Sequence, residues 1–393
     1  MGSTVVVGYA RTPFGRYLGS LKSLAAVDLG AVALREALRR AKVAPEAVDY
    51  VYMGMVLQAG AGQIPSRQAT IKAGLPATVP SDTINKVCAS GMRAVNLGEM
   101  MIRSGEAAVV AAGGMENMSA APYLLEQART GLRMGDAAWV DGMIKDGLWC
   151  PFHQVHMGVH GSKIPAAHGI TREEMDRWAL RSHRLAIEAM DSGKLAEEIV
   201  PVAVPQRKGE PQLVKDDELP RRDTTYEKLA ALPPAFEPDG LITAGNAPAI
   251  SDGAAALVLA SEERAREWGL EPLAALVAHG HASLEPPYIA TVPYHAAEAA
   301  LRKAGLTAQQ MDRIEVNEAF AAVALTAMKL GDWPEHKVNV NGGAVALGHP
   351  IGASGARILI SLIAELRRRG GGYGLATICS GAAQGEAVIV KVG

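Results

Sequence analysis

The sequence contains little cysteine and no long hydrophobic run. Three cysteines in 393 residues cannot build a disulfide framework, so we expect a cytoplasmic, reduced protein in which each cysteine is a reactive thiol or a core residue. Apolar stretches such as residues 107–112 are far shorter than the roughly 20 residues that cross a bilayer. No basic segment followed by an apolar core opens the chain, so we expect neither a membrane partner nor a secretory signal.

An excess of charge of one sign is also missing. The 39 basic and 41 acidic side chains give a formal net charge of −2, so no positive field is available to hold a nucleic acid, and we exclude that partner. The chain has neither a Walker phosphate loop nor a G-x-G-x-x-G turn in the right context, so ATP and nicotinamide cofactors lack their usual marker. Residues 352–356 miss the hydrolase elbow because the last glycine is replaced by alanine.

What the sequence does contain is an internal repeat. Residues 37–41 (Ala-Leu-Arg-Arg-Ala) recur as residues 300–304 (Ala-Leu-Arg-Lys-Ala), and residues 89–93 (Ala-Ser-Gly-Met-Arg) recur as residues 353–357 (Ala-Ser-Gly-Ala-Arg). The two recurrences lie in nearly the same register although they are far apart in the chain. This agreement predicts two similar halves.

The pattern in each half predicts a helix, a strand and a glycine-rich turn that opens a second helix. Apolar residues at helical spacing form one stripe in each half, at Val27, Ala31, Leu34 and Leu38 and at Leu359, Leu362, Ile363 and Leu366. Short apolar runs predict strands buried on both faces, at residues 5–7, 107–112, 255–260, 375–379 and 387–390. Strands that alternate with helices indicate a layered α/β fold, here built twice.

The region between the halves differs in composition. It carries proline-rich and charged stretches and most of the histidines, and a capping-box pattern at residues 171–174 predicts a helix that runs towards Ala189. We therefore predict three units: a first half of residues 1–118 plus 250–269, an inserted domain of residues 119–249 that covers a site on the core, and a second half of residues 270–393.

Two cysteines and a histidine are the candidates for chemistry. Cys88 precedes a predicted helix, whose unpaired N–H groups and dipole favour a thiolate, although a buried apolar role is an equal alternative from position alone. His349 lies in the turn that mirrors the turn of Cys88 in the repeat. Cys379 ends a predicted strand before Ser380 and Gly381, a chain reversal whose N–H groups can bind an anion. A thiol and an imidazole brought together from distant segments make an activated nucleophile.

A fourth group of residues has the spacing of metal ligands. Cys150, His153, His156 and His160 could lie along one helical face. No second ligand pair is evident, however, and Pro151 interrupts the run. We therefore expect no metal ion, and we interpret these side chains as a polar pocket wall.

Four segments resemble, in order, the active-site motifs of the thiolase family. They are residues 85–91 (Asn-Lys-Val-Cys-Ala-Ser-Gly), residues 113–119 (Gly-Gly-Met-Glu-Asn-Met-Ser), residues 317–320 (Asn-Glu-Ala-Phe) and residues 342–350, which end in Gly-His-Pro. The resemblance covers essentially the whole chain. It implies duplicated halves that form a layered α/β/α/β/α core, with an inserted loop domain that binds coenzyme A.

The resemblance also implies a role for each catalytic residue. In a reversible Claisen condensation of acetyl-CoA, or thiolysis of a short 3-oxoacyl-CoA, Cys88 would carry the acyl group after His349 takes its thiol proton. Cys379 would remove the α-proton of the second acetyl-CoA. The enolate oxygen would be held by His349 and by a water on Asn317, and the tetrahedral oxyanion by the N–H groups of Cys88 and Gly381.

Substrate contacts follow from the same resemblance. Arg221 would bind the nucleotide end of coenzyme A, His156 and Met157 would line the acyl pocket, and Ala247 and Phe320 are further substrate contacts. No cofactor is implied, because the coenzyme A thioesters are themselves the substrates. The family forms dimers and tetramers, so we expect a homodimer or a homotetramer.

Two departures from the family pattern concern the substrate pocket. Pro248 replaces a serine in the Asn-Ala-Ser-Gly stretch and removes a hydroxyl and an N–H that could meet pantetheine. Ala382 and Ala383 stand where glycines are usual, and their Cβ atoms restrict positive φ. An alternative function is a non-catalytic acyl-CoA-binding subunit of a multienzyme assembly. A one-way condensing enzyme is a third, and such enzymes generally lack the second cysteine.

Overall fold

The computed structural model describes residues 3–393, and a mixed ten-stranded sheet forms its centre. The strand order is β14-β15-β16-β13-β1-β12-β5-β3-β4, with the short β2 paired to β12. The strands are β1 (Thr4–Arg11), β2 (Gly15–Arg16), β3 (Tyr50–Gly54), β4 (Ser81–Ile84), β5 (Val109–Asn117), β12 (Ser251–Ser261), β13 (Ala274–Ser283), β14 (Arg313–Val316), β15 (Gly372–Ser380) and β16 (Gln384–Val392).

The strand pairing confirms the duplication predicted from the repeat. In the first half β1 pairs antiparallel with β12, β12 antiparallel with β5, and β5 parallel with β3. In the second half β13, β16, β15 and β14 repeat the same sequence of directions. The halves join where β1 pairs antiparallel with β13, with Thr4 opposite Leu276.

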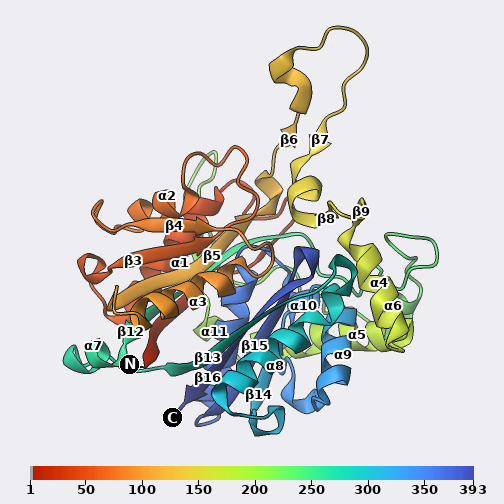
Figure 1. Cartoon of the computed structure of the whole chain (residues 1–393). Coiled ribbons are helices and arrows are strands. Elements are labelled where there is room, and N and C mark those ends of the chain that lie inside the picture. The colour runs from red at the N-terminus through yellow and green to blue at the C-terminus, as the bar shows by residue number, and fades with distance from the viewer. Residues whose placement is uncertain (1–2) are drawn as a thin grey trace.

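The helices complete the expected layers (Figure 1). Helix α1 (Ala26–Ala41) packs on β1, β5 and β12 of the first half, and α8 (Val292–Ala304) packs on β13, β15 and β16 of the second. Helices α3 (Ser90–Arg103) and α11 (Ser354–Arg368) contact each other and strands of both halves. The order is therefore α/β/α/β/α, with α3 and α11 in the middle layer.

The local signals in the sequence explain these elements. The apolar stripe of α1 is buried, as is nearly every residue of α11. All of β5 is buried, as expected for a strand covered by helices on both faces. Shorter helices cover the outer layers: α2 (Pro65–Lys72) packs on α1, α9 (Ala321–Gly331) on α8, and α7 (Glu262–Glu267) lies after β12.

In the described chain, residues 119–249 contribute no strand to the large sheet. They form three hairpins and three helices: β6 (Tyr123–Leu124) with β7 (Val140–Asp141), β8 (Trp149–Cys150) with β9 (Val155–His156), β10 (Val202–Val204) with β11 (Gln212–Val214), and α4 (Met157–Ala167), α5 (Arg172–Asp191) and α6 (Tyr226–Ala230). Helix α5 starts at the predicted capping box, where Thr171 and Glu174 bond each other's backbone N–H groups. The β6–β7 hairpin and the chain between its strands form an arm that projects from the body (Figure 1).

A buried ion cluster fastens this region to the core. The guanidinium of Arg11, in β1, donates two hydrogen bonds to Asp217, at 2.8 and 2.9 Å, and one to Glu198, at 2.9 Å. All three side chains are almost fully buried. No helix within residues 3–393 is both long and apolar enough to cross a membrane.

Candidate active site

The turn that carries Cys88 is held in a strained conformation. Val87, the residue before it, has φ +42°, which a β-branched residue rarely adopts. Ser90 stabilises the turn, because its hydroxyl accepts from the N–H of Lys86 at 2.8 Å and donates to the carbonyl of Val87 at 2.6 Å. The strain costs about 1–3 kcal/mol, and strain of this size is typical of active sites.

The sulfur of Cys88 receives backbone hydrogen bonds from two N–H groups, its own and that of Gly381. These are the two groups expected to form the oxyanion hole. The position of Cys88 before a helix predicts a lowered thiol pKa, and here the structure differs. Burial dominates and raises the pKa of Cys88 to about 12, with the two hydrogen bonds and the charge of Glu116 as smaller influences. At neutral pH the thiol of Cys88 is therefore uncharged.

Cys379 lies beside the Cys88 turn. It ends β15 and is fully buried, and burial and the nearby Cys88 together hold the pKa of its thiol well above the usual range. The next residue, Ser380, donates its hydroxyl to the carbonyl of Lys86. A Cβ on Gly381 would lie 3.3 Å from the side chain of Val87. The two cysteine-bearing turns thus pack directly on each other.

His349 carries a buried, neutral imidazole. Its Nδ1 lies 2.5 Å from the hydroxyl of Ser354, which already donates to the carbonyl of Pro350 at 2.9 Å. Nδ1 therefore carries the hydrogen, and Nε2 is the free acceptor. Nε2 is buried and has no hydrogen-bond partner among residues 3–393. Burial, assisted by the charge of Arg357, lowers the pKa of His349 to about 3.

The turn of His349 meets the turn of Cys88 through the glycines of the repeat. A Cβ on Gly91 would lie 2.9 Å from the carbonyl oxygen of Gly352, and one on Gly355 would lie 2.5 Å from the backbone nitrogen of Met92. Only glycine permits this approach of α3 and α11. The predicted meeting of the two mirrored turns is therefore present in the fold.

Asn317 follows β14, and its side-chain amide has no hydrogen-bond partner in the described structure. Its side chain is fully buried, and neither Oδ1 nor Nδ2 has a hydrogen-bond partner among the described residues. Its backbone N–H donates to the carbonyl of Thr377 at 3.0 Å, which places it beside the strand that ends at Cys379. A buried unpaired amide costs about 1–3 kcal/mol, so this one is well suited to hold a water or a substrate atom.

Three buried glutamates that the sequence analysis did not single out hold these turns. Glu116 accepts from the N–H groups of Val56, Leu57 and Gly352, and burial raises its pKa to about 7. Glu386 accepts from Lys86 at 2.6 Å.

The third, Glu318, joins the loop after β14 to helix α5 and to the short helix α10 (Ala344–Leu347) that precedes His349. It accepts from Trp178, Ser182 and the N–H of Val345. The sequence contains a signal for two of these glutamates, because Glu116 and Glu318 stand inside two of the quoted motifs. An acidic residue in an apolar context is rarely buried without partners.

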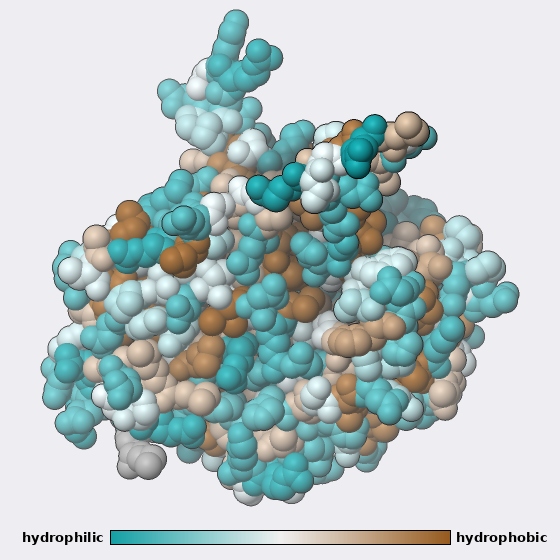
Figure 2. All heavy atoms as spheres, turned by 45° about the horizontal axis from the view of Figure 1, so that its top comes forward, coloured by the Kyte–Doolittle hydropathy of each residue, from teal (hydrophilic) through white to brown (hydrophobic). Residues whose placement is uncertain are grey.

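A cavity of about 1080 Å³ opens next to the two cysteine turns. Its lining includes Asn85, Val87, Gly381 and Ala382 from these turns and Met157 from the start of α4. Figure 2 shows hydrophobic side chains gathered near the centre of the face that it turns forward, between hydrophilic rims. The cavity is large enough for the pantetheine end of an acyl-CoA.

Among the other expected substrate contacts, His156 and Phe320 do not line this cavity. His156 caps α4, since its Nδ1 accepts from the N–H of Gly158, and its ring stacks on Phe236 at 4.2 Å. Phe320 is buried in the same apolar cluster as Met157 and Cys379.

Arg221 and Ala247 are not among the described residues that line the cavity. Arg221 is exposed, and its backbone N–H donates to His183. Ala247 is partly buried against the apolar cluster that contains Phe320.

The two alanines after Gly381 adopt the conformation that glycine favours. Ala382 has φ +59° and Ala383 has φ +50°. The turn therefore keeps a left-handed path despite the Cβ atoms, at a cost of about 1–2 kcal/mol per residue. The methyl group of Ala382 lies in the lining of the cavity.

The comparisons with known proteins agree with this geometry. The model of the thiolase N-terminal domain matches residues 4–263, and that of the thiolase C-terminal domain matches residues 270–392. The chain belongs to the thiolase family.

Individual relatives and a solved structure show which members of the family the chain resembles. The chain is 50% identical to an acetyl-CoA acetyltransferase of Cupriavidus necator over 100% of both chains. It is 49% identical to one of Pseudomonas aeruginosa over 99% of both. The crystal structure of the Bacillus anthracis acetyl-CoA acetyltransferase matches with a TM-score of 0.98 and 42% identity, over 100% of this chain and 99% of that one.

Proposed function

We propose that the protein is an acetyl-CoA C-acyltransferase, which condenses acetyl-CoA with an acyl-CoA and cleaves short 3-oxoacyl-CoA in reverse. The observation that carries the proposal is the set of unsatisfied groups around two buried thiols. Nε2 of His349 and the amide of Asn317 have no partner among residues 3–393, and the Cys88 sulfur sits on two backbone N–H groups. Such groups are costly to leave unpaired unless a reacting molecule uses them.

The first half of the reaction loads Cys88. Nε2 of His349 takes the thiol proton while the sulfur attacks the thioester carbonyl of an acyl-CoA. The oxyanion accepts hydrogen bonds from the N–H groups of Cys88 and Gly381, each worth about 3 kcal/mol in such a hole. The intermediate collapses to an acyl-Cys88 thioester, and the departing coenzyme A sulfur takes the proton of Cys379. Cys379 is then a thiolate.

The second half forms the carbon–carbon bond. The Cys379 thiolate takes a proton from the α-carbon of acetyl-CoA, and its burial makes it a strong base. The enolate oxygen is held by the protonated His349 and by a water on Asn317. The enolate carbon attacks the acyl-Cys88 carbonyl, Cys88 leaves as a thiolate, and His349 returns its proton to it. The 3-oxoacyl-CoA is released with both thiols and the imidazole as they began.

The alternative functions fit the site less well. A non-catalytic acyl-CoA-binding subunit has no need of two thiols and a free imidazole on turns that pack on one another. A one-way condensing enzyme generally lacks the second cysteine, and Cys379 is present here. Arg221 remains our candidate for the nucleotide end of coenzyme A, with Ala247 and Phe320 as further contacts.

The test is protein acetylation followed by mass spectrometry, together with thiolysis of acetoacetyl-CoA followed by loss of its enolate absorbance. With acetyl-CoA alone we expect an acetyl group on the peptide that contains Cys88, and none in Cys88→Ser. Cys379→Ser is expected to acetylate still, because a thiolate leaves without prior protonation, but to fail in condensation. Acetylation of Cys88→Ser would contradict the roles. No turnover at any 3-oxoacyl length would instead favour the acyl-CoA-binding subunit.

We also propose a cytoplasmic homodimer or homotetramer. The cytoplasmic assignment is supported by the three free thiols, which form no disulfide within the described chain. The oligomer is supported by the β6–β7 arm, which carries exposed apolar side chains away from the body.

A further inference from the structure

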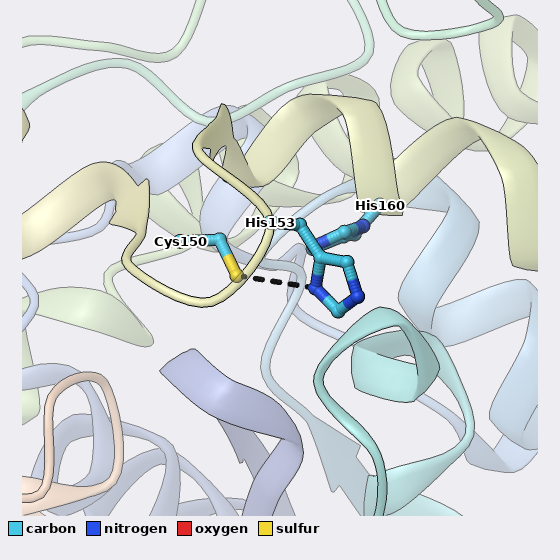
Figure 3. A group of neighbouring side chains, drawn as sticks. All are labelled: Cys150, His153 and His160. Atoms are coloured by element: carbon cyan, nitrogen blue, oxygen red, sulfur yellow. Dashed lines mark hydrogen bonds between the residues drawn. The ribbon is translucent and has the colours of Figure 1, made fainter.

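Beside the cavity, the structure gathers three side chains with the chemistry of metal ligands. Cys150 ends β8, His153 lies in the turn between β8 and β9, and His160 lies in α4. In Figure 3 the three side chains come from the hairpin and from the helix into one small region. From the sequence we expected no metal, because no second ligand pair is evident and Pro151 interrupts the run of possible ligands. The hairpin removes that objection, since it folds Cys150 and His153 back towards α4.

The distances suit a tetrahedral ion. One ligand atom from each residue can be chosen such that all three lie within 4.8 Å of one another. The Sγ of Cys150 and Nδ1 of His153 are 3.7 Å apart. With Zn–S and Zn–N bonds of about 2.3 and 2.0–2.1 Å, two ligands of tetrahedral zinc lie about 3.6 Å apart. The rings of His153 and His160 meet edge to face, with centroids 5.2 Å apart.

Burial shows that this cluster is more than a chance surface group. Cys150 is fully buried and His160 is 5% exposed, yet Nε2 of His160 has no hydrogen-bond partner in the part of the chain described. A buried imidazole nitrogen without a partner carries a free-energy cost that a ligand would remove. The fourth residue of the sequence pattern, His156, is not part of the cluster; its ring stacks on Phe236 and its Nδ1 accepts from the N–H of Gly158.

We propose that Cys150, His153 and His160 bind one zinc ion. A thiolate with two imidazoles favours zinc over magnesium or calcium, which prefer oxygen ligands. Binding releases the thiol proton of Cys150 to solvent, and both imidazoles bind in their neutral form. Three protein ligands leave the fourth position to water, which the exposed His153 side of the site admits.

The ion would fix one wall of the substrate cavity. Trp149, Pro151, Gln154 and Met157 all line the cavity and are chain neighbours of the three ligands. Zinc would tie the β8–β9 hairpin to the first turns of α4. None of the three ligands takes part in the proposed reaction, so the metal site stands whether or not that reaction is correct.

Cobalt(II) is the probe, because a cobalt–thiolate bond gives a near-ultraviolet charge-transfer band. The full-length protein is stripped of metal with a chelator and titrated with cobalt. We expect the band to saturate at one ion per chain and to be abolished by zinc, which displaces cobalt without absorbing. Cys150→Ser should lose the band. His153→Ala and His160→Gln should weaken cobalt binding by more than about tenfold, the lower range seen when even supporting groups are removed.

Matched variants separate this site from the reacting thiols. His168→Gln, at the C-terminal end of α4, should bind cobalt as the parent does. Cys88→Ser should also keep the band. If Cys88→Ser loses the band and Cys150→Ser keeps it, the metal sits among the reacting thiols and the proposal is wrong. The absence of any band in the parent protein also overturns it.

Thermal unfolding gives a readout that does not depend on a buried substitution. Zinc that binds only the folded state raises the midpoint of unfolding. We expect this rise in the parent protein and in His168→Gln, and none in His153→Ala. Because His153 is exposed, its replacement should leave the fold intact. An equal rise in His153→Ala and the parent would contradict the assignment of that ligand.

Discussion

At the residue scale, burial decides the protonation state of the reacting groups. The N-terminal end of a helix favours a thiolate, and that argument predicts a lowered pKa for Cys88. The structure encloses the sulfur so fully that its pKa rises to about 12, while the pKa of His349 falls to about 3 for the same reason. At neutral pH both groups are uncharged. In the proposed reaction, His349 would therefore take the proton of Cys88 only as the sulfur attacks a bound thioester.

This state predicts the pH dependence of Cys88 alkylation in the free enzyme. A thiol with a raised pKa is less ionised at each pH below that value, so its rate with iodoacetamide should climb about tenfold per pH unit from neutrality upwards. For the same peptide in unfolded protein, the alkylation rate should level off at about pH 9, because an unperturbed thiol is ionised at that pH. Rates are measured by mass spectrometry of the Cys88 peptide. A plateau below about pH 8 in the folded enzyme would show a stabilised thiolate instead.

At the element scale, buried charges attach separate parts of the chain to one another. Arg11, in β1, holds Asp217 and Glu198. Glu116, at the end of β5, holds the loop after β3 and the loop before α11. Local propensity shaped each element, but these long-range contacts set how the elements meet at the site.

The Arg11 cluster gives a stability prediction. Arg11→Met keeps most of the side-chain volume but leaves two buried carboxylates without their partner, so we expect a loss of about 3–5 kcal/mol in the free energy of unfolding. Urea unfolding measures this loss. The matched control is Arg222→Met, which removes the exposed pair with Asp191 and should change stability little. Equal effects of the two substitutions would mean that burial does not set the strength of the cluster.

At the scale of the whole molecule, the β6–β7 arm carries apolar side chains that a single chain leaves exposed. Met134 is 97% exposed and Trp139 is 69% exposed on a segment that projects from the body. Large apolar side chains on such a projection are typical of an interface. The covering partner that we propose is a second copy of the chain.

The arm gives a prediction for assembly. We expect the purified protein to run as a dimer or a tetramer in size-exclusion chromatography with light scattering. Replacing Met134 and Trp139 together by serine should shift it to a smaller species. Tyr288→Ser, which removes a 40% exposed apolar side chain from the body, should leave the size unchanged. A monomeric parent protein would refute the proposed oligomer.

The sequence by itself determined the family and the duplicated α/β fold, and it supplied the residues that we propose as the reacting groups. Cys88, His349 and Cys379 stand in motifs that are legible in a linear chain, and the helix of the inserted region begins at its capping box. These features are local, because periodicity and capping depend on neighbouring residues. The assignment of residues 119–249 as a separate domain stays a prediction.

Only the tertiary structure decided the pKa shifts and which side chains from distant segments lie together. The direction of the Cys88 pKa shift, the tautomer of His349 and the orphaned amide of Asn317 depend on which atoms surround each group. The convergence of Cys150 with His160 depends on a hairpin that helical spacing did not predict. Burial and contacts between distant segments are properties of the packed chain, and no window of sequence contains them.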